Sequence, residues 1–102
     1  MVHKSVFITG ANGGLGFETS NIMALQGFGR ITMAARTLQK AETAKARLLK
    51  DVAPKGIIET AGGFDMNDPK SIEDAIANLP KGKPYNIIFL QAGGVVFGHN
   101  YR

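Results

Sequence analysis

Short apolar runs alternate along the chain with segments in which apolar residues recur at every third or fourth position. The apolar runs predict four strands, over residues 5–9, 30–35, 56–61 and 86–91. The helical spacing predicts three helices, over residues 15–26, 38–52 and 69–79. Regular alternation of strands and helices is typical of an α/β domain with a parallel sheet.

The last predicted strand contains the run Ile87-Ile88-Phe89-Leu90, which is apolar throughout rather than alternating. Such runs belong to parallel strands that are covered on both faces. Right-handed connections between four parallel strands give the order 3-2-1-4, one half of a doubly wound sheet flanked by helices. Ligands of such sheets bind beyond the carboxyl ends of the first and fourth strands, where this sequence has glycine-rich segments at 10–16 and 91–94.

The first glycine-rich segment, Thr-Gly-Ala-Asn-Gly-Gly-Leu-Gly at 9–16, directly joins a predicted strand to a predicted helix. A pyrophosphate needs backbone N–H groups and the positive end of a helix at close range. We therefore expect Gly10 to make the turn, Gly14 to allow the close approach, and Gly16 to pack the helix tightly on the strand. The alternative is that the glycines only form a tight turn. The predicted dinucleotide-binding residues of this segment are Gly10, Asn12, Gly13, Gly14, Leu15 and Gly16.

The end of the second predicted strand reads Ala34-Ala35-Arg36-Thr37 and carries no acid. NAD-binding chains place an acid there to bind the ribose 2′-hydroxyl. An arginine instead suits a 2′-phosphate, which it binds through planar, charge-assisted hydrogen bonds. The sequence thus predicts NADP(H) in preference to NAD(H), with an exposed surface charge as the alternative role of Arg36. Lys40 is either a second contact to this phosphate or, more simply, a solvated lysine.

These segments resemble the short-chain dehydrogenases/reductases, in particular the retinol-dehydrogenase-like and protochlorophyllide-reductase-like branches, over nearly the whole chain. Thr9-Gly10-x-x-x-Gly14-x-Gly16 is similar to the cofactor motif of that family, and residues 33–42 are similar to its NADP-type second strand and the start of the following helix. The resemblance implies a Rossmann-type fold and an NADP(H) cofactor for hydride transfer between nicotinamide and a carbonyl or alcohol.

The resemblance also implies cofactor contacts outside the glycine segment. Asp65 and Met66 resemble the acid and apolar pair that contacts the adenine ring, although Asp65 is also a common turn residue. Gln91, Ala92 and Gly93 take the place of the family's Asn-Ala-Gly beside the cofactor's ribose. Gln91 departs from that pattern by one methylene group, which changes its hydrogen-bonding geometry.

The catalytic residues that the resemblance implies, a serine and a Tyr-x-x-x-Lys pattern, do not accompany this cofactor motif. Tyr85 is followed four positions later by Phe89, and Tyr101 is the penultimate residue. We therefore assign no catalytic residue, and the sequence leaves open whether the chain is an enzyme. We expect residues 1–102 to be an NADP(H)-binding Rossmann half-domain, truncated before the catalytic segment. The alternative is a non-catalytic, NADP-responsive regulatory module that acts through a partner chain.

The fourth predicted strand is apolar and has no predicted neighbour on its outer edge, and such edges invite pairing. We expect it to be covered by a missing C-terminal segment on a separate polypeptide, by a second copy of the chain, or by the tail segment Val95-Val96-Phe97.

Composition narrows the class of protein further. The chain has 102 residues, 44% of them hydrophobic and 20% charged, which fits one globular domain. It has no cysteine and no apolar run long enough to cross a membrane, so we expect a cytoplasmic protein without thiolate chemistry. The net charge of +4 suits an anionic ligand, but no aromatic platform or arginine stripe supports nucleic-acid binding. The two histidines do not suggest a metal site, and Lys45, Arg47 and Lys50 are interpreted as a solvated helix face.

Overall fold

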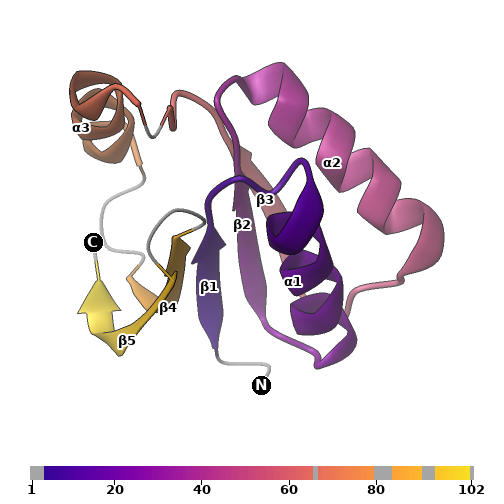
Figure 1. Ribbon diagram of the computed structural model, residues 1–102. Coiled ribbons are helices and arrows are strands. Elements are labelled where there is room, and N and C mark those ends of the chain that lie inside the picture. The colour runs from indigo at the N-terminus through magenta and orange to yellow at the C-terminus, as the bar shows by residue number, and fades with distance from the viewer. Residues whose placement is uncertain (1–3, 66, 80–83, 91–93, 102) are drawn as a thin grey trace.

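The computed structural model describes residues 4–65, 67–79, 84–90 and 94–101. Strands and helices alternate up to residue 90, as the hydrophobic pattern predicts (Figure 1). The elements are β1 (Ser5–Ile8), α1 (Gly14–Leu25), β2 (Arg30–Ala34), α2 (Leu38–Asp51), β3 (Ile57–Ala61), α3 (Pro69–Ala77), β4 (Tyr85–Leu90) and β5 (Gly94–Tyr101). The sheet has the order β3-β2-β1-β4-β5, and its first four strands are parallel. The predicted order 3-2-1-4 of the Rossmann-type half-sheet is therefore confirmed.

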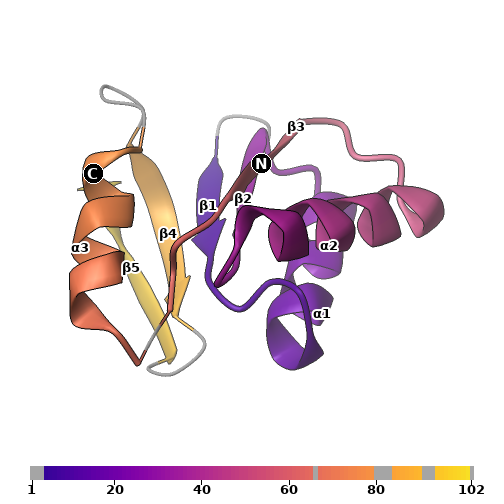
Figure 2. The same ribbon diagram turned by 90° about the horizontal axis from the view of Figure 1, so that it is seen from above.

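Helices cover both faces of this sheet, with α1 and α2 on one side and α3 on the other (Figure 2). Side chains alternate between the two faces along each strand, so Val6 and Ile8 belong to one hydrophobic cluster and Phe7 to another. The cluster beneath α1 and α2 is built around Val6, Ile8, Phe17, Ile31, Met33, Leu48 and Phe89. The cluster on the α3 side contains Phe7, Ala34, Phe64, Ala75 and Tyr85.

The buried face of α1 differs from the one that its large apolar residues suggest. Leu15 and Ile22 are 59% and 53% exposed, although their spacing helped to predict the helix. The buried residues of the helix are instead Gly16, Phe17, Thr19, Ser20 and Ala24, among which the small residues Gly16, Ser20 and Ala24 recur every four positions. Small residues on this face allow the helix axis to approach the sheet closely, and the Ser20 hydroxyl donates to the Gly16 carbonyl at 2.9 Å.

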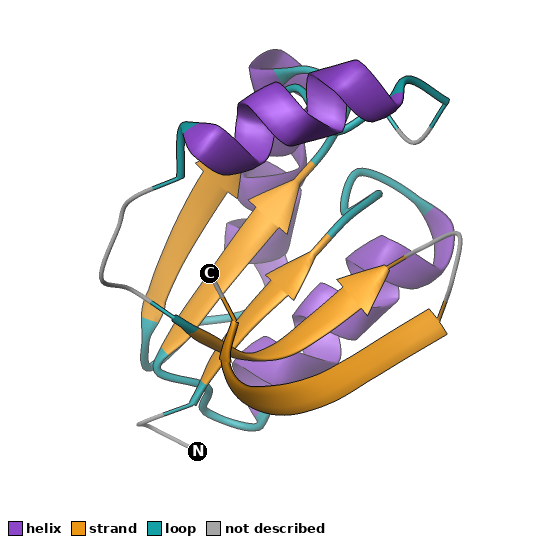
Figure 3. Cartoon of the chain, turned by 90° about the vertical axis from the view of Figure 1, so that its left-hand side faces the viewer, coloured by secondary structure: helices purple, strands orange, loops and turns teal. Residues whose placement is uncertain are grey.

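The outer edge of β4 is paired with β5, which runs antiparallel to it (Figure 3). In this register Phe89 lies opposite Val95, and Ile88 lies opposite Val96. Of the three expected ways to cover the edge, the structure shows pairing with the chain's own tail. The predicted four-stranded half-sheet thus gains a fifth strand. The sequence offered the tail as one of three possible covers without predicting a strand there, and a short connection suffices because the added strand is antiparallel.

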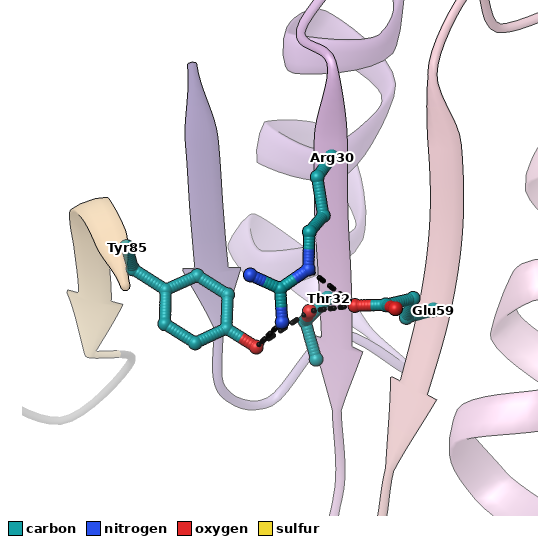
Figure 4. Close-up of polar contacts among 4 residues, drawn as sticks. All are labelled: Arg30, Thr32, Glu59 and Tyr85. Atoms are coloured by element: carbon teal, nitrogen blue, oxygen red, sulfur yellow. Dashed lines mark hydrogen bonds and ion pairs between the residues drawn. The ribbon is translucent and has the colours of Figure 1, made fainter. Parts of the chain in front are cut away.

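A polar cluster joins three strands on the α3 side of the sheet (Figure 4). Arg30 Nε donates to Glu59 Oε1 at 2.6 Å, and Arg30 Nη2 donates to the Tyr85 hydroxyl at 2.8 Å. The Thr32 hydroxyl lies 2.9 Å from the Tyr85 hydroxyl and donates to Glu59 Oε1 at 3.2 Å. Burial raises the pKa of Tyr85, and the hydrogen bond to Thr32 and the charge of Arg30 partly oppose that rise. The cluster therefore ties β4 across β1 to β2 and β3.

No helix in the part of the chain that the structure describes is long and apolar enough to span a membrane.

Candidate cofactor site

The glycine segment crosses from the carboxyl end of β1 to the start of α1 and is tied to both neighbouring strands. The Ala11 N–H donates to the Ala34 carbonyl at the end of β2, at 3.0 Å. The Thr9 N–H donates to the Phe89 carbonyl in β4, also at 3.0 Å. The segment therefore lies at the predicted switch point, because α2, which follows β2, and α3, which precedes β4, cover opposite faces of the sheet (Figure 2).

Two glycines of this segment have a backbone conformation that other residues avoid. Gly10 has a φ of 61° and Gly14 a φ of 53°, both in the left-handed region. A Cβ at Gly14 would meet no heavy atom within 4 Å, so the space above this residue is open. These observations agree with the turn expected at Gly10 and with the room for close approach expected at Gly14. Gly16 is buried, as its expected packing role requires.

The N-terminus of α1 is arranged differently from those of the other two helices. Asp68 caps α3 and Thr37 caps α2, each by accepting a backbone N–H with its side chain. The residue at the same position before α1 is Gly13, and no described side chain caps this helix. Its first N–H groups and its positive dipole end are thus free of a side-chain cap, an arrangement that suits an anion.

The loop between β2 and α2 is held by the loop that follows β3. The Ala35 N–H donates to the Ala61 carbonyl at 3.0 Å, and the Phe64 N–H donates to the Ala35 carbonyl at 3.1 Å. The Gly63 N–H donates to the Arg36 carbonyl, also at 3.1 Å. These bonds fix the backbone of Arg36 at the end of β2, while its side chain is exposed. The predicted 2′-phosphate contact is therefore presented to solvent at the carboxyl end of the sheet.

A pocket of about 490 Å³ opens between the glycine segment and α2. Its lining residues are Asn12, Thr37, Gln39, Lys40, Thr43, Ala44 and Arg47. They include two cations and no carboxylate, so the described lining favours an anionic ligand. The structure brings two residues considered from the sequence, Asn12 and Lys40, to one pocket, whereas Arg36 is not among the described lining residues.

Arg47 is a pocket residue that the sequence interpretation missed, because it was assigned to a solvated charged face. Its guanidinium carbon lies 4.0 Å from the centroid of the Phe17 ring in α1. The signal that could have found it is the helical spacing of the pocket residues. Thr43, Ala44 and Arg47 follow Lys40 by three, four and seven positions, so all four share one helix face. That face is now seen to line the pocket.

The remaining predicted contacts are placed only in part. Asp65 uses its carboxylate Oδ1 to accept the Asn67 N–H at 3.0 Å, which is the turn-forming role raised as its alternative. Met66, Gln91, Ala92 and Gly93 lie outside the described residues. Leu15 is exposed in the first turn of α1. The described residues contain no group of three or more histidine, aspartate or glutamate side chains that could hold a metal ion.

A doubly wound parallel sheet with an uncapped glycine segment at its switch point defines the class of Rossmann-type α/β domains. The pattern of the family described as KR domain matches residues 4–97. The chain therefore belongs to the KR domain family, within the short-chain dehydrogenases/reductases.

Similar proteins agree with this assignment. The chain is 32% identical over 99 residues to the WW domain-containing oxidoreductase of Gallus gallus, covering 96% of this chain and 23% of that protein. It is 47% identical over 47 residues to the short chain dehydrogenase sol3 of Alternaria solani, covering 46% of this chain and 16% of that protein. The solved menthone neomenthol reductase from Mentha piperita has a TM-score of 0.75 and 25% identity, covering 91% of this chain and 32% of that one. The chain thus spans a third or less of the length of these relatives. Further solved neighbours of this fold contain NADPH.

Proposed function

We propose that this chain binds the adenosine and pyrophosphate portion of NADP(H) for a short-chain dehydrogenase/reductase. The complete enzyme would transfer hydride between the nicotinamide and a carbonyl or alcohol substrate. The observation that carries the proposal is the cationic pocket between the glycine segment and α2, beside the uncapped N-terminus of α1. The pyrophosphate would lie against the N–H groups of that helix end, with the 2′-phosphate toward α2.

The preference for NADP(H) over NAD(H) is supported by the residues that follow β2. The loop carries the exposed Arg36 where an acid would bind the ribose 2′-hydroxyl, and Lys40 lines the neighbouring pocket. A solved neighbour that is 29% identical over 72% of this chain contains NADP, which agrees with this preference.

We propose that the complete site also includes the residues predicted from the resemblance. Gly10, Gly13, Gly14 and Gly16 would shape the pyrophosphate cradle. Asp65 and Met66 would contact the adenine, and Gln91, Ala92 and Gly93 would lie beside the ribose. The chain contains no Tyr-x-x-x-Lys pattern, so residues 1–102 would act as a half-domain whose proton-transfer residues lie elsewhere in the complete enzyme.

The alternative function is a non-catalytic, NADP-responsive regulatory module that acts through a partner chain. Because β5 pairs with β4, the sheet edge that such a partner could meet is that of β5 rather than that of β4. The affinity of the isolated chain separates the two functions. A half-site should bind NADPH weakly because the nicotinamide half would lack the walls that the rest of the enzyme supplies, whereas a regulatory module should bind at micromolar concentrations or below.

The first test is isothermal titration of the chain with NADPH and with NADH. We expect tighter binding of NADPH, and a selective loss of that preference in Arg36→Glu with unchanged far-UV circular dichroism. Lys50→Glu is the matched control, because it makes the same charge change at an exposed position of α2 outside the pocket lining. Equal affinity of the wild-type chain for both nucleotides would contradict the NADP(H) assignment. Absence of binding to either would overturn the proposed function.

We further propose a cytoplasmic location, on the ground that a chain without cysteine suits a reducing compartment. Fractionation of cells that express the tagged chain should recover it in the cytosolic fraction. Recovery in a secreted or organellar fraction would refute this location.

A further inference from the structure

The wall of the pocket on the α2 side carries a second cation in addition to Lys40. Arg47 lies seven residues beyond Lys40, a rise of about 10 Å along the helix axis. Long side chains on a helix lean toward its N-terminus, which for Arg47 is the direction of Lys40. Both residues line the same pocket as Asn12, which belongs to that segment.

The position of the Arg47 guanidinium is set by an aromatic ring from another helix. Its central carbon lies 4.0 Å from the centroid of the Phe17 ring. Phe17 is only 6% exposed and follows Gly16 directly at the start of α1. A guanidinium that stacks through its face keeps the N–H groups at its edge available for an anion. Phe17 therefore holds a cation beside the helix end at which the pyrophosphate is proposed to bind.

We infer that Arg47 is a specificity-determining residue that binds the 2′-phosphate of NADP(H) together with Lys40, using Phe17 as its support. This inference rests on the proposed function and adds a residue to the same site. The chemistry of the lining agrees with it, since the two cations are accompanied by the side-chain amides of Asn12 and Gln39 and by no described carboxylate. Phosphate dianions are the ligands that such a set of donors recognises.

A purely structural role for Arg47 makes a different prediction. If the guanidinium only covers the Phe17 ring, its removal should lower stability slightly and should affect all nucleotides alike. A 2′-phosphate contact should instead discriminate between two nucleotides that differ in that phosphate alone. The adenosine nucleotides 2′,5′-ADP and 5′-AMP form such a pair, and neither needs the nicotinamide end of the site.

The experiment is to titrate the full 102-residue chain with 2′,5′-ADP and, separately, with 5′-AMP. Isothermal titration calorimetry measures the affinity for each nucleotide. We expect Arg47→Met to weaken the binding of 2′,5′-ADP by about three- to fivefold, the upper part of the range for one exposed ion pair, and to leave the affinity for 5′-AMP within about twofold. Arg47→Lys should retain most of the affinity. The methionine side chain keeps an apolar contact with Phe17, and Arg47→Gln serves as a second neutral variant if Arg47→Met does not fold.

Lys50→Met is the matched control, because it removes one positive charge from an exposed position of α2 outside the pocket lining. An equal loss in Lys50→Met would show a general effect of charge and would overturn the inference. So would unchanged 2′,5′-ADP binding in both neutral variants of Arg47, or an equal loss for both nucleotides. If NADPH still binds in preference to NADH in that case, the proposed function stands and only the role of Arg47 is refuted. If the wild-type chain binds neither NADPH nor 2′,5′-ADP, both are refuted.

Discussion

The substitution Tyr85→Phe tests the polar cluster that joins β4 to β2 and β3. It removes one hydroxyl, which lies 2.8 Å from Arg30 Nη2 and 2.9 Å from the Thr32 hydroxyl. The ring is retained, so its edge-to-face contact with Phe7, at a centroid distance of 5.3 Å, remains. The variant therefore isolates the hydrogen bonds from the packing.

The size of the stability loss depends on which partners of the Tyr85 hydroxyl keep other hydrogen bonds. Thr32 still donates to Glu59, and Arg30 still donates to Glu59 at 2.6 Å. The lost bonds are one neutral and one charge-assisted interaction, at a tyrosine that is only 4% exposed. We expect the free energy of unfolding to fall by about 1–2 kcal/mol. For a domain of this size, that corresponds to a decrease in Tm of roughly 5–15 °C.

Urea denaturation followed by far-UV circular dichroism measures this loss, since the chain has no tryptophan to report by fluorescence. Thr60→Val is the control, because it removes a hydroxyl that donates to Glu42 at 2.9 Å in an exposed pair. It should change the free energy of unfolding by less than about 0.5 kcal/mol. A loss in Tyr85→Phe no larger than that of the control would refute the reasoning.

The pH dependence of stability gives a second readout of the same residue. The pKa of Tyr85 is raised by burial above its ordinary value of about 10. The unfolded chain therefore releases the phenolic proton at a lower pH than the folded chain does. The contribution of Tyr85 is fully present below about pH 10 and is lost as the pH rises above that value. Tyr85→Phe should reduce the alkaline loss of stability, and an identical alkaline decline in both proteins would contradict this assignment.

Three further substitutions test local backbone features, two at glycines near the site and one at the cap of α3. Gly14→Ala should lower the free energy of unfolding, measured by urea denaturation, by about 1–2 kcal/mol, because the φ of Gly14 is left-handed. Gly13→Ala is the control and should be tolerated, because the φ of Gly13 is extended at −167°. Equal losses in the two variants would contradict this reasoning. Gly62→Ala should lower Tm and disturb the start of α2, because its Cβ would overlap the backbone nitrogen of Leu38; an unchanged melting curve would show that the close approach is absent. Asp68→Ala removes a side chain that accepts hydrogen bonds from two backbone N–H groups of α3, and it should lower the free energy of unfolding by about 1 kcal/mol. Asp68→Asn should retain most of the stability. Equal losses in both variants would argue against the cap.

The site was predictable from the sequence to the extent that it is local. The glycine spacing, its position between a strand and a helix, and the arginine after β2 all lie in short segments, and the structure places these segments at the carboxyl ends of adjacent strands. The part of the pocket wall formed by Arg47 was missed because Arg47 contacts Phe17, which is thirty positions away and belongs to another helix. Charge spacing on α2 alone does not distinguish a solvated face from a pocket wall.

The sequence by itself determined the alternation of strands and helices, the parallel order of β1 to β4 and the glycine segment at the switch point. These features follow from hydrophobic period and from backbone conformations that only glycine adopts readily, which are properties of short stretches of chain. Only the tertiary structure decided which face of α1 is buried, how the edge of β4 is covered, and which residues meet in the polar cluster and in the pocket. Each of these depends on contacts between segments that are distant in the sequence. The small residues of α1 pack against the sheet, β5 pairs with β4, and Tyr85 accepts a hydrogen bond from Arg30, 55 positions away. Such contacts form only when packing brings the segments together, so no local pattern specifies them.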